Sequence, residues 1–549
     1  MLGRGYWTPD EPREADLAWR MSWQAQKAVP LLAGEAFCEK PPLTYWLAAV
    51  PIKLFGAQGW AARLPNLLYA AITALGVGLL ARRSAGSVAG IVAAAAVGTF
   101  LLSYQVAIWL ATDAPLLAAV SIAMLGTYRG FYATSTRERL HGYLIMHAAL
   151  GVGFLCKSAV VWMVPSMALV ALVIWEKRWR ELWRWELYVG VALQAAIIFS
   201  WIWFVYIGTD GPAHLKVFFW NNLVGRFTRV DAPNDLQYAS AHRNSPGKYL
   251  VELPLYLAPW TLLVMAAARR AWQQRRTPLD AYRPVRFALA ASLPPLALLS
   301  VAATARNVYF APALPGVALL LGWWARESLK NPSRWDIRAL RATSAMLLLG
   351  VMIFIAALGL SAADSWNTMN GRAGFIFISA LGLGAAAALS VRAWTQAGDR
   401  PLLAQCSLFL AYCALLAGPA SQVYSRVDEW QDLGLIAHAI ERDARSKPLI
   451  LFAPDETTRA IIDMYARTRV ELVPGPIDAA GITRLKVAAA AVPGSLILVQ
   501  LPGRTPWQGS VPAPDVTSAL SWLPAASMRP VQSYFLPHGR RYALLELAP

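Results

Sequence analysis

The feature that most constrains this chain is a series of long apolar blocks that recurs along its first three-quarters. A helix needs about 20 residues to cross the hydrocarbon core of a bilayer. About twelve blocks approach that length, and they cover residues 60–82, 88–108, 113–131, 141–155, 160–175, 185–207, 249–268, 287–303, 308–324, 342–360, 374–391 and 402–420. Because 57% of the residues are hydrophobic and only 15% are charged, the composition agrees with this pattern. We therefore predict a mainly α, polytopic membrane protein.

The net charge of +18 would suggest a nucleic-acid partner if it were read alone. The basic residues, however, gather in every second short loop between the apolar blocks, where they act as topology signals. These loops contain Arg82 and Arg83; Arg137 and Arg139; Lys177, Arg178, Arg180 and Arg184; Arg269, Arg270, Arg275, Arg276 and Arg283; Arg326, Lys330, Arg334 and Arg338; and Arg392 and Arg400. We expect them to face the cytoplasm, and the intervening loops and the tail after Ala420 to face outward. No nucleic-acid partner is predicted.

An even number of predicted spans does not agree with the polar N-terminal segment of the chain. About twelve spans and an outward C-terminus require an outward N-terminus, yet residues 1–40 are polar and contain no apolar segment that would export them. We therefore expect the natural protein to have one more helix before Met1. A chromosomal product no larger than 59.9 kDa on a blot would contradict this expectation.

The chain divides into three predicted parts. Residues 1–60 form an outward loop with juxtamembrane helices, residues 61–421 form the transmembrane bundle, and residues 422–549 form an outward domain. In the last part, short buried strands are predicted at 449–452, 469–473 and 496–500, with helices at 456–466 and 479–492 between them. This pattern indicates a small α/β unit. Because no Gly-rich phosphate loop follows a strand, we predict no nucleotide cofactor.

Several ionisable residues are expected at the outward ends of the spans, and each also has a purely structural interpretation. The Asp10–Glu11 pair is ordinarily a solvated acidic pair in a loop. Asp113 is well placed as the N-cap of a transmembrane helix. Lys157 either extends to the interface or binds an anionic ligand. His242 is ordinarily a solvated loop histidine. Taken singly, these residues do not define a site.

A short apolar run, residues 43–55, follows Glu39 and Lys40. It is too short for a span and is interrupted by Pro51 and Lys53, so we expect it to lie along the membrane surface. Such a helix would hold Glu39 and Lys40 at the depth of the lipid head groups.

The order and spacing of the motifs resemble those of a known family. The run 8–13 reads Thr-Pro-Asp-Glu-Pro-Arg, and the run 39–44 reads Glu-Lys-Pro-Pro-Leu-Thr. Together they are similar to the first outward loop of the aminoarabinose transferases and related polyprenyl-phosphate-dependent enzymes of the GT-C fold. Further motifs at 55–56, 62–66, 111–115, 154–157, 222–227 and 257–260, with His242 and Pro246, resemble the family in the same order. The resemblance covers most of the chain.

The resemblance implies a fold and an activity. The family has a transmembrane bundle with juxtamembrane helices and an outward C-terminal domain, and its first helix precedes the Asp-Glu loop, which agrees with the parity expectation. The implied activity is transfer of a sugar from polyprenyl (undecaprenyl) phosphate to an acceptor such as the lipid A phosphate. The implied location is the periplasmic face of the bacterial inner membrane, and 4-amino-4-deoxy-L-arabinose is the candidate sugar.

The chemistry of the implied reaction assigns roles to these residues. The donor leaves behind a phosphate monoester, so the site needs cations to stabilise the leaving group, and Arg13 and Lys40 are the leading candidates. The resemblance assigns substrate binding to Glu11, Arg13, Lys40, Lys157, Arg306 and Tyr309. Asp10 would orient or deprotonate the acceptor, and Asp113 would help to position the acceptor or the sugar. The expected reaction is a single displacement with inversion. Glu39 and His242 form a candidate site for a divalent metal, although one carboxylate and one imidazole are a sparse ligand set.

Departures from the family pattern leave the sugar open. The family usually has tyrosine where this chain has Glu14, and Lys-Gly-Pro where it has Lys-Ser-Ala at 157–159. A carboxylate at Glu14 would repel a phosphate, so it either points away or meets an amino sugar.

Two alternatives remain at this stage. One keeps the lipid-phosphate donor and replaces the acceptor by a protein hydroxyl or another glycan, as in mannosyltransferases. The other is a non-enzymatic transporter of lipid or glycan, which should show internal repeats and gapped helix pairs, and neither is predicted here. In every case the expected partners are a lipid-linked substrate, a lipid or glycan acceptor and the membrane lipids.

Overall fold

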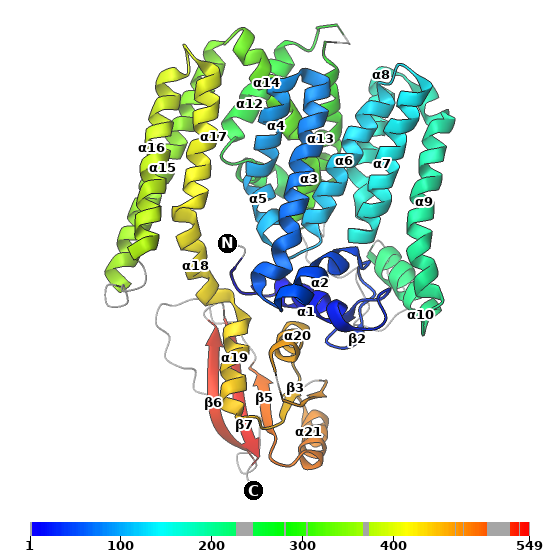
Figure 1. Cartoon of the computed structure of the whole chain (residues 1–549), viewed down its shortest axis with the longest axis vertical. Coiled ribbons are helices and arrows are strands. Elements are labelled where there is room, and N and C mark those ends of the chain that lie inside the picture. The colour runs from blue at the N-terminus through cyan, green and yellow to red at the C-terminus, as the bar shows by residue number, and fades with distance from the viewer. Residues whose placement is uncertain are drawn as a thin grey trace. The chain divides into compact units, whose positions relative to one another are not determined.

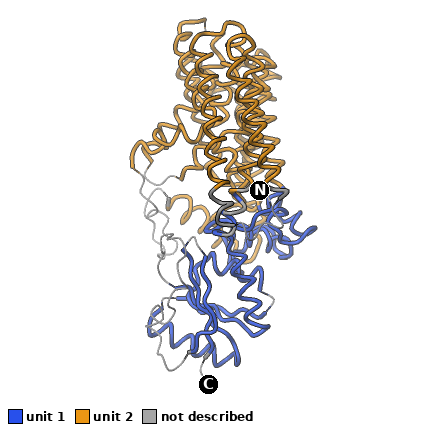
Figure 2. Tube along the Cα trace, turned by 90° about the vertical axis from the view of Figure 1, so that its left-hand side faces the viewer, with its two compact units in different colours: residues 1–37, 45–64, 424–549 blue, residues 38–44, 65–423 orange. Residues whose placement is uncertain are grey.

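The computed structural model describes residues 3–226, 245–278, 281–302, 306–365, 373–466, 468–475, 477–501, 528–536 and 539–547. The chain forms two compact units (Figure 2). Unit 1 comprises residues 1–37, 45–64 and 424–549, and unit 2 comprises residues 38–44 and 65–423.

Unit 2 is a bundle of helices (Figure 1). Its helices, the first and last of which extend into unit 1, are α3 (Gly59–Ala85), α4 (Ser87–Thr99), α5 (Leu101–Ile108), α6 (Asp113–Phe131), α7 (Thr136–Lys157), α8 (Met163–Glu176), α9 (Trp185–Tyr206), α10 (Gly211–Lys216), α11 (Lys248–Tyr256), α12 (Thr261–Gln273), α13 (Arg283–Val301), α14 (Leu314–Lys330), α15 (Arg334–Ser365), α16 (Ala373–Gln396), α17 (Pro401–Ala417) and α18 (Pro419–Gln431). Across the described residues, nine helical stretches are long and apolar enough to span a membrane, and two bent pairs raise the number to eleven.

One of the nine stretches, Thr136–Glu176, contains two helices. A 3₁₀ turn, Ser158–Trp162, separates α7 from α8, and Ser158 has a φ of +65° that ends α7. The predicted block 141–155 falls within α7, and the block 160–175 covers the end of the 3₁₀ turn and most of α8. The membrane-spanning helical architecture is therefore the one that the apolar blocks predict.

The blocks 88–108 and 249–268, predicted as continuous spans, are both broken. The helix direction changes by 61° between α4 and α5 and by 112° between α11 and α12. The break at Phe100 has an extended ψ of 136°, and the other break contains Pro259, which has no N–H to donate. The Leu101 N–H donates to the Ala258 carbonyl at 2.8 Å, and the Trp260 indole N–H donates to the Thr99 hydroxyl at 2.8 Å. Each break thus supplies partners for polar groups at the other, as an apolar environment requires.

Small residues bring α6 and α7 together. A Cβ on Gly126 would lie 2.4 Å from the Met146 nitrogen, and one on Gly142 would lie 2.3 Å from the Gly130 nitrogen. Only glycine allows so close an approach of two backbones, as at other membrane helix interfaces. Because α6 and α7 are consecutive, antiparallel neighbours, the first turn of α6 and the last turn of α7 lie at the same end of the bundle (Figure 1).

Unit 1 combines segments from both ends of the chain. Its N-terminal elements are α1 (Asp10–Trp23), a short hairpin of β1 (Leu31–Leu32) and β2 (Glu35–Ala36), and most of α2 (Leu43–Phe55). Its C-terminal elements are α19 (Leu433–Ala444), β3 (Leu449–Phe452), α20 (Glu456–Tyr465), β4 (Val470–Val473), α21 (Ala479–Ala491), β5 (Leu496–Gln500), β6 (Met528–Leu536) and β7 (Arg540–Leu547). The helix predicted at 43–55 is present with those bounds.

The five C-terminal strands form one sheet in the order β4-β3-β5-β7-β6. Strand β3 is parallel to β4 and β5, whereas β7 is antiparallel to β5 and β6. Buried side chains of the central strands, such as Ile450, Phe452 and Ile497, form its core with Leu485 of α21. The predicted α/β unit is confirmed, with β6 and β7 as strands that were not predicted.

Candidate active site

The predicted site residues are divided between the two units. Unit 1 contains Asp10, Glu11 and Arg13, and unit 2 contains Glu39, Lys40, Asp113, Lys157, Arg306 and Tyr309. His242 lies outside the described residues.

In unit 2, Asp113 and Lys157 form an ion pair between the first turn of α6 and the last residue of α7. Their side chains are 12% and 13% exposed, so the pair is shielded but not sealed from solvent. The Lys157 amine also lies over the ring of Tyr309, 5.3 Å from its centroid. Three predicted site residues are therefore in one place.

This geometry corrects both structural interpretations of the pair. The N-cap of α6 is Thr112, not Asp113, and the Asp113 carboxylate pairs with a cation from another helix instead. Lys157 does not extend away to an interface, because its amine is held beside Asp113.

Arg306 and Tyr309 lie at the start of a 3₁₀ segment, Asn307–Ala313. The Tyr309 N–H donates to the Arg306 carbonyl at 2.9 Å, and the buried Tyr249 hydroxyl donates to the same carbonyl. The backbone of Arg306 is thus fixed from two sides while its side chain is exposed. This support also sets the position of the Tyr309 ring beside Lys157.

The loop that carries Glu39 and Lys40 is tied to the same unit by two motif residues to which the sequence assigned no role. The Asn222 amide donates to the Glu39 carbonyl at 2.5 Å, and the Thr44 hydroxyl lies 3.4 Å from the Cys156 carbonyl, next to Lys157. Glu39 and Lys40 are half-buried. The motifs at 39–44 and 154–157 and the motif residue Asn222 are therefore parts of one local structure.

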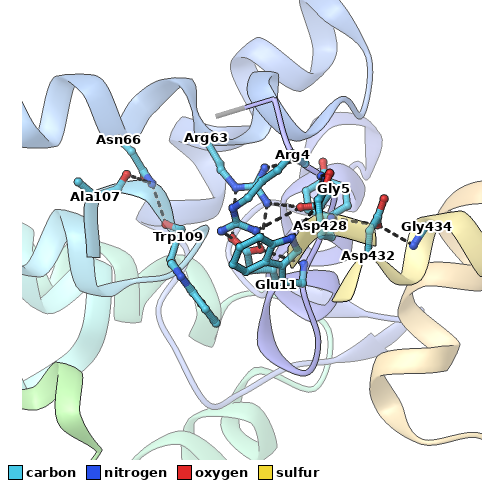
Figure 3. Close-up of polar contacts among 12 residues, drawn as sticks. Arg4, Gly5, Glu11, Arg63, Asn66, Ala107, Trp109, Asp428, Asp432 and Gly434 are labelled. Atoms are coloured by element: carbon cyan, nitrogen blue, oxygen red, sulfur yellow. Dashed lines mark hydrogen bonds and ion pairs between the residues drawn. The ribbon is translucent and has the colours of Figure 1, made fainter. Parts of the chain in front are cut away.

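Asn66 supports the approach to Asp113 from the other side. Its amide donates to the Ala107 carbonyl at 3.0 Å and to the Trp109 carbonyl at 2.7 Å (Figure 3). Because these carbonyls belong to the last turn of α5 and to the segment that follows it, Asn66 fixes the chain that leads into Asp113. This supporting role of Asn66 had no signal in the sequence beyond the motif at 62–66.

In unit 1, Glu11 lies at the centre of a buried polar cluster with Arg4 and Arg63 (Figure 3). The Arg4 Nη2 donates to Glu11 Oε1 at 2.8 Å, Arg63 Nη2 donates to Oε2 at 2.9 Å, and the Trp7 N–H donates to Oε2 at 2.9 Å. The Glu11 and Arg63 side chains are 0% exposed. Although burial opposes ionisation, the charges of Arg63 and Arg4 hold the pKa of Glu11 below its usual value.

We infer that Glu11 has a structural role, in contrast to the substrate-binding role that the family resemblance suggests. Its carboxylate is surrounded by protein donors in the interior, so a substrate would have to displace an arginine to reach it. The sequence could not indicate this, because Arg4 and Arg63 are 59 residues apart.

The same N-terminal segment is tied to residues more than 400 positions away in unit 1 (Figure 3). The Gly5 N–H donates to Asp428 Oδ1 at 2.9 Å, and the Trp7 indole N–H donates to the same oxygen at 2.7 Å. The Tyr6 N–H donates to Asp432 Oδ1 at 3.2 Å. Burial raises the pKa of Asp432 to about 6.

Arg13 lies on the exposed side of α1, where its Nε is 2.8 Å from Glu456 Oε2 in α20. Its guanidinium also lies 5.8 Å from the centroid of the Phe37 ring. Asp10, the first residue of α1, is half-buried. The C-terminal domain thus contacts one of the predicted phosphate ligands directly.

Glu14, the departure from the family pattern, faces the interior of unit 1. It is 6% exposed and accepts a hydrogen bond from the Tyr45 hydroxyl of α2 at 3.1 Å. The sequence allows Glu14 either to point away from the phosphate site or to meet an amino sugar. The structure agrees with the first of these, because the carboxylate points into unit 1.

No group of three or more His, Cys, Asp or Glu side chains that could hold a metal ion is found among the residues that the structure describes. Since His242 is outside that part of the chain, the metal site at Glu39 and His242 stays a prediction.

The family of dolichyl-phosphate-mannose-protein mannosyltransferases matches residues 39–203. The undecaprenyl phosphate-alpha-4-amino-4-deoxy-L-arabinose arabinosyl transferase of Pseudomonas paraeruginosa is 28% identical over 374 residues, or 65% of this chain. Enzyme 1 of the same name from Pseudomonas fluorescens is 29% identical over 58% of this chain. The matched parts span only 62% and 55% of these two relatives' own lengths.

Two crystal structures of ArnT from Cupriavidus metallidurans, one in the apo state and one bound to undecaprenyl phosphate, match with a TM-score of 0.68. They cover 99% of this chain and 94% of theirs at 19% and 20% identity, so they establish the fold.

The fold and the site define a multi-pass membrane protein of the GT-C class. Within that class, the chain is similar to the aminoarabinose transferases and, over residues 39–203, to the protein mannosyltransferases.

Proposed function

We propose that this chain transfers a sugar from a polyprenyl-phosphate carrier to an acceptor at the periplasmic face of the bacterial inner membrane. The observation that carries the proposal is the Asp113–Lys157 pair beside Tyr309, in a fold shared with a protein solved with undecaprenyl phosphate. The relatives named for undecaprenyl phosphate-linked aminoarabinose support that sugar as the donor group, with the lipid A phosphate as the acceptor.

In the proposed reaction, an acceptor oxygen forms a bond to the anomeric carbon while the bond from that carbon to the phosphate oxygen breaks. The electron pair of the broken bond leaves with the phosphate, whose negative charge increases. Lys157 is the cation that would stabilise this charge, because its amine is shielded by protein and therefore interacts strongly with a nearby anion. Lys40, Arg306 and Arg13 are the further candidates.

The proton of the acceptor would pass to a carboxylate. Asp10 is the proposed general base, and Asp113 would hold the Lys157 amine in place until the phosphate replaces it as a partner. Glu39, with His242, remains the candidate metal ligand, and no step above depends on a metal.

The experiment is transfer of labelled aminoarabinose from its polyprenyl phosphate to lipid A in membranes that contain the protein. We expect transfer by the wild type and loss of transfer in Asp10→Asn with normal protein levels. Asp210→Asn, which changes an exposed aspartate, is the matched control. No transfer by folded wild-type protein would contradict the proposed substrates, and full transfer by Asp10→Asn would remove Asp10 from the mechanism.

A second candidate is transfer to a protein or glycan hydroxyl, and the match of residues 39–203 to the protein mannosyltransferases favours it. It would be supported if polyprenyl-phosphate mannose and a serine- and threonine-containing peptide gave product where lipid A gave none.

A further inference from the structure

Unit 1 contains a cleft of about 620 Å³ between the end of α1 and the end of α2. Its lining includes Trp19, Trp23, Lys27, Ile52 and Lys53. The two tryptophans pack edge to face with their centroids 5.5 Å apart, and Trp23 is 57% exposed. None of the predicted site residues that the structure describes lines this cleft, so the proposed transfer reaction assigns it no role.

The charge of the cleft is one-sided. Lys27 and Lys53 come from different segments and both line it, whereas no Asp or Glu does. The Lys27 amine donates to the Met21 carbonyl at 2.5 Å, and in the described part of the chain Lys53 has no carboxylate partner. Desolvation, and then the positive charge of Lys53, lower the pKa of Lys27. Two lysines that repel each other in one cleft are stabilised by an anion between them.

The helix beside the cleft has a second, apolar surface. Val50, Leu54 and Phe55 of α2 are 58%, 70% and 51% exposed, while Tyr45 and Ile52 on its other face are buried. The Trp46 indole N–H donates to the Lys27 carbonyl at 2.8 Å, which ties the lysine-bearing loop to this helix. A short helix with exposed apolar side chains next to lysines and tryptophans has the composition of an interfacial membrane helix.

We propose that this cleft binds the phosphate head group of an anionic membrane lipid, with its acyl chains along Val50, Leu54 and Phe55 of α2. Lys27 and Lys53 contact the phosphate, and the Trp19–Trp23 pair packs against the glycerol and the upper part of the chains. Such a lipid anchors α2. The loop that contains Glu39 and Lys40 directly precedes this helix in the chain. The site is independent of which sugar or acceptor the chain uses.

The test is native mass spectrometry of the full chain in detergent, titrated with dioleoyl phosphatidylglycerol or dioleoyl phosphatidylcholine. We expect the wild type to retain phosphatidylglycerol in preference to phosphatidylcholine. The Lys27→Gln/Lys53→Gln variant should bind phosphatidylglycerol roughly tenfold more weakly, since each lysine near an anionic lipid contributes measurably to its affinity. Lys486→Gln, an exposed lysine of α21, is the control and should bind as the wild type does.

Equal retention of both lipids, or unchanged phosphatidylglycerol affinity in the double variant, would overturn the proposal. Displacement of the lipid by millimolar inorganic phosphate would also overturn it, because the cleft would then recognise a free anion and not a lipid. If the double variant does not fold, Lys53→Gln alone provides the same test, since its side chain is exposed.

Discussion

The Glu11 cluster of unit 1 and the Asp113–Lys157 pair of unit 2 use the same residue types for different purposes. Both place a motif carboxylate beside a cation. Glu11 is 0% exposed and has two arginines and a backbone N–H as partners, whereas Asp113 is 12% exposed and pairs with one lysine, Lys157. A carboxylate enclosed by donors maintains structure, and a pair that solvent partly reaches can exchange a partner for a ligand.

The difference has an energetic meaning. Removing one member of a fully buried ion network leaves the others charged and unpaired, at a cost of about 3–5 kcal/mol. A pair that is partly exposed costs less to break, because water solvates the remaining charge. Stability measurements should therefore respond to the unit 1 cluster, and activity measurements to the unit 2 pair.

The largest effect on stability is expected for Arg63→Met. The change leaves Glu11 buried beside Arg4 alone and removes the donors to the Arg4 and Gly5 carbonyls. We expect the free energy of unfolding of unit 1 to fall by about 3–5 kcal/mol, detected as a lower melting temperature and faster trypsin cleavage. Arg529→Met, at an exposed position of β6, should have little effect. An unchanged melting temperature for Arg63→Met would contradict the structural role of the cluster.

The next effect is expected for Asp113→Asn, and it concerns activity. Asparagine keeps the size of the side chain but no longer holds Lys157 by charge, so sugar transfer should fall by about 100-fold. The melting temperature should stay close to that of the wild type. Asp210→Asn, which neutralises an exposed aspartate, should transfer normally. If Asp113→Asn retained full transfer, the pair would have no part in the reaction.

A smaller effect, on the pH dependence of stability, is expected for Asp432→Asn. Because burial raises the pKa of Asp432 from 3.8 to about 6, the folded state binds this proton more tightly than the unfolded state does. Protonated Asp432 therefore stabilises the folded state. This contribution to the free energy of unfolding, on the order of 2 kcal/mol, is complete below about pH 4 and is lost as the pH rises through 6. Asparagine can still accept from the Gly434 and Tyr6 N–H groups but does not titrate.

The melting temperature should therefore fall less between pH 4 and pH 7 in Asp432→Asn than in the wild type. Burial also raises the pKa of Asp16 to about 6. Because Asp16 is present in both proteins, it contributes the same pH dependence of melting temperature to each. Parallel pH profiles of the two proteins would refute the role given to Asp432.

The smallest effect is expected for Glu456→Gln. Its ion pair with Arg13 is partly exposed, with side-chain exposures of 25% and 55%, so its contribution is within about 1 kcal/mol. If Arg13 contacts the donor phosphate, the KM for the donor should change by about two- to fivefold with kcat unchanged. Glu546→Gln, which breaks an exposed pair with Lys447 in the same domain, is the control. A change in kcat alone would show that Glu456 acts in another way.

The sequence predicted the elements whose signal is local. The bounds of α6 agree with the block 113–131, and β3 and β5 agree with the strands at 449–452 and 496–500, because apolar runs of these lengths have few alternatives. The breaks at Phe100 and Pro259 were not predicted, since each depends on a hydrogen-bond partner at the other break.

The sequence could list candidate site residues but not their pairings. Lys157 lies 44 residues from Asp113, and nothing local indicates that glycine packing of α6 on α7 brings them together. In the same way, the Glu11 cluster depends on Arg63, 52 residues away, so that Glu11 was assigned to substrate binding. Gly5 contacts Asp428 and Tyr6 contacts Asp432, each more than 400 residues away. No local pattern in the sequence indicates these contacts.

The most direct test measures sugar transfer per folded molecule and melting temperature side by side for Lys157→Met and Glu11→Gln. We expect Lys157→Met to keep the wild-type melting temperature and lose transfer, and Glu11→Gln to lose melting temperature while its folded fraction transfers at nearly the wild-type rate. The reverse pattern, with normal transfer by Lys157→Met and a stable but inactive Glu11→Gln, would contradict the division into a structural cluster and a reactive pair.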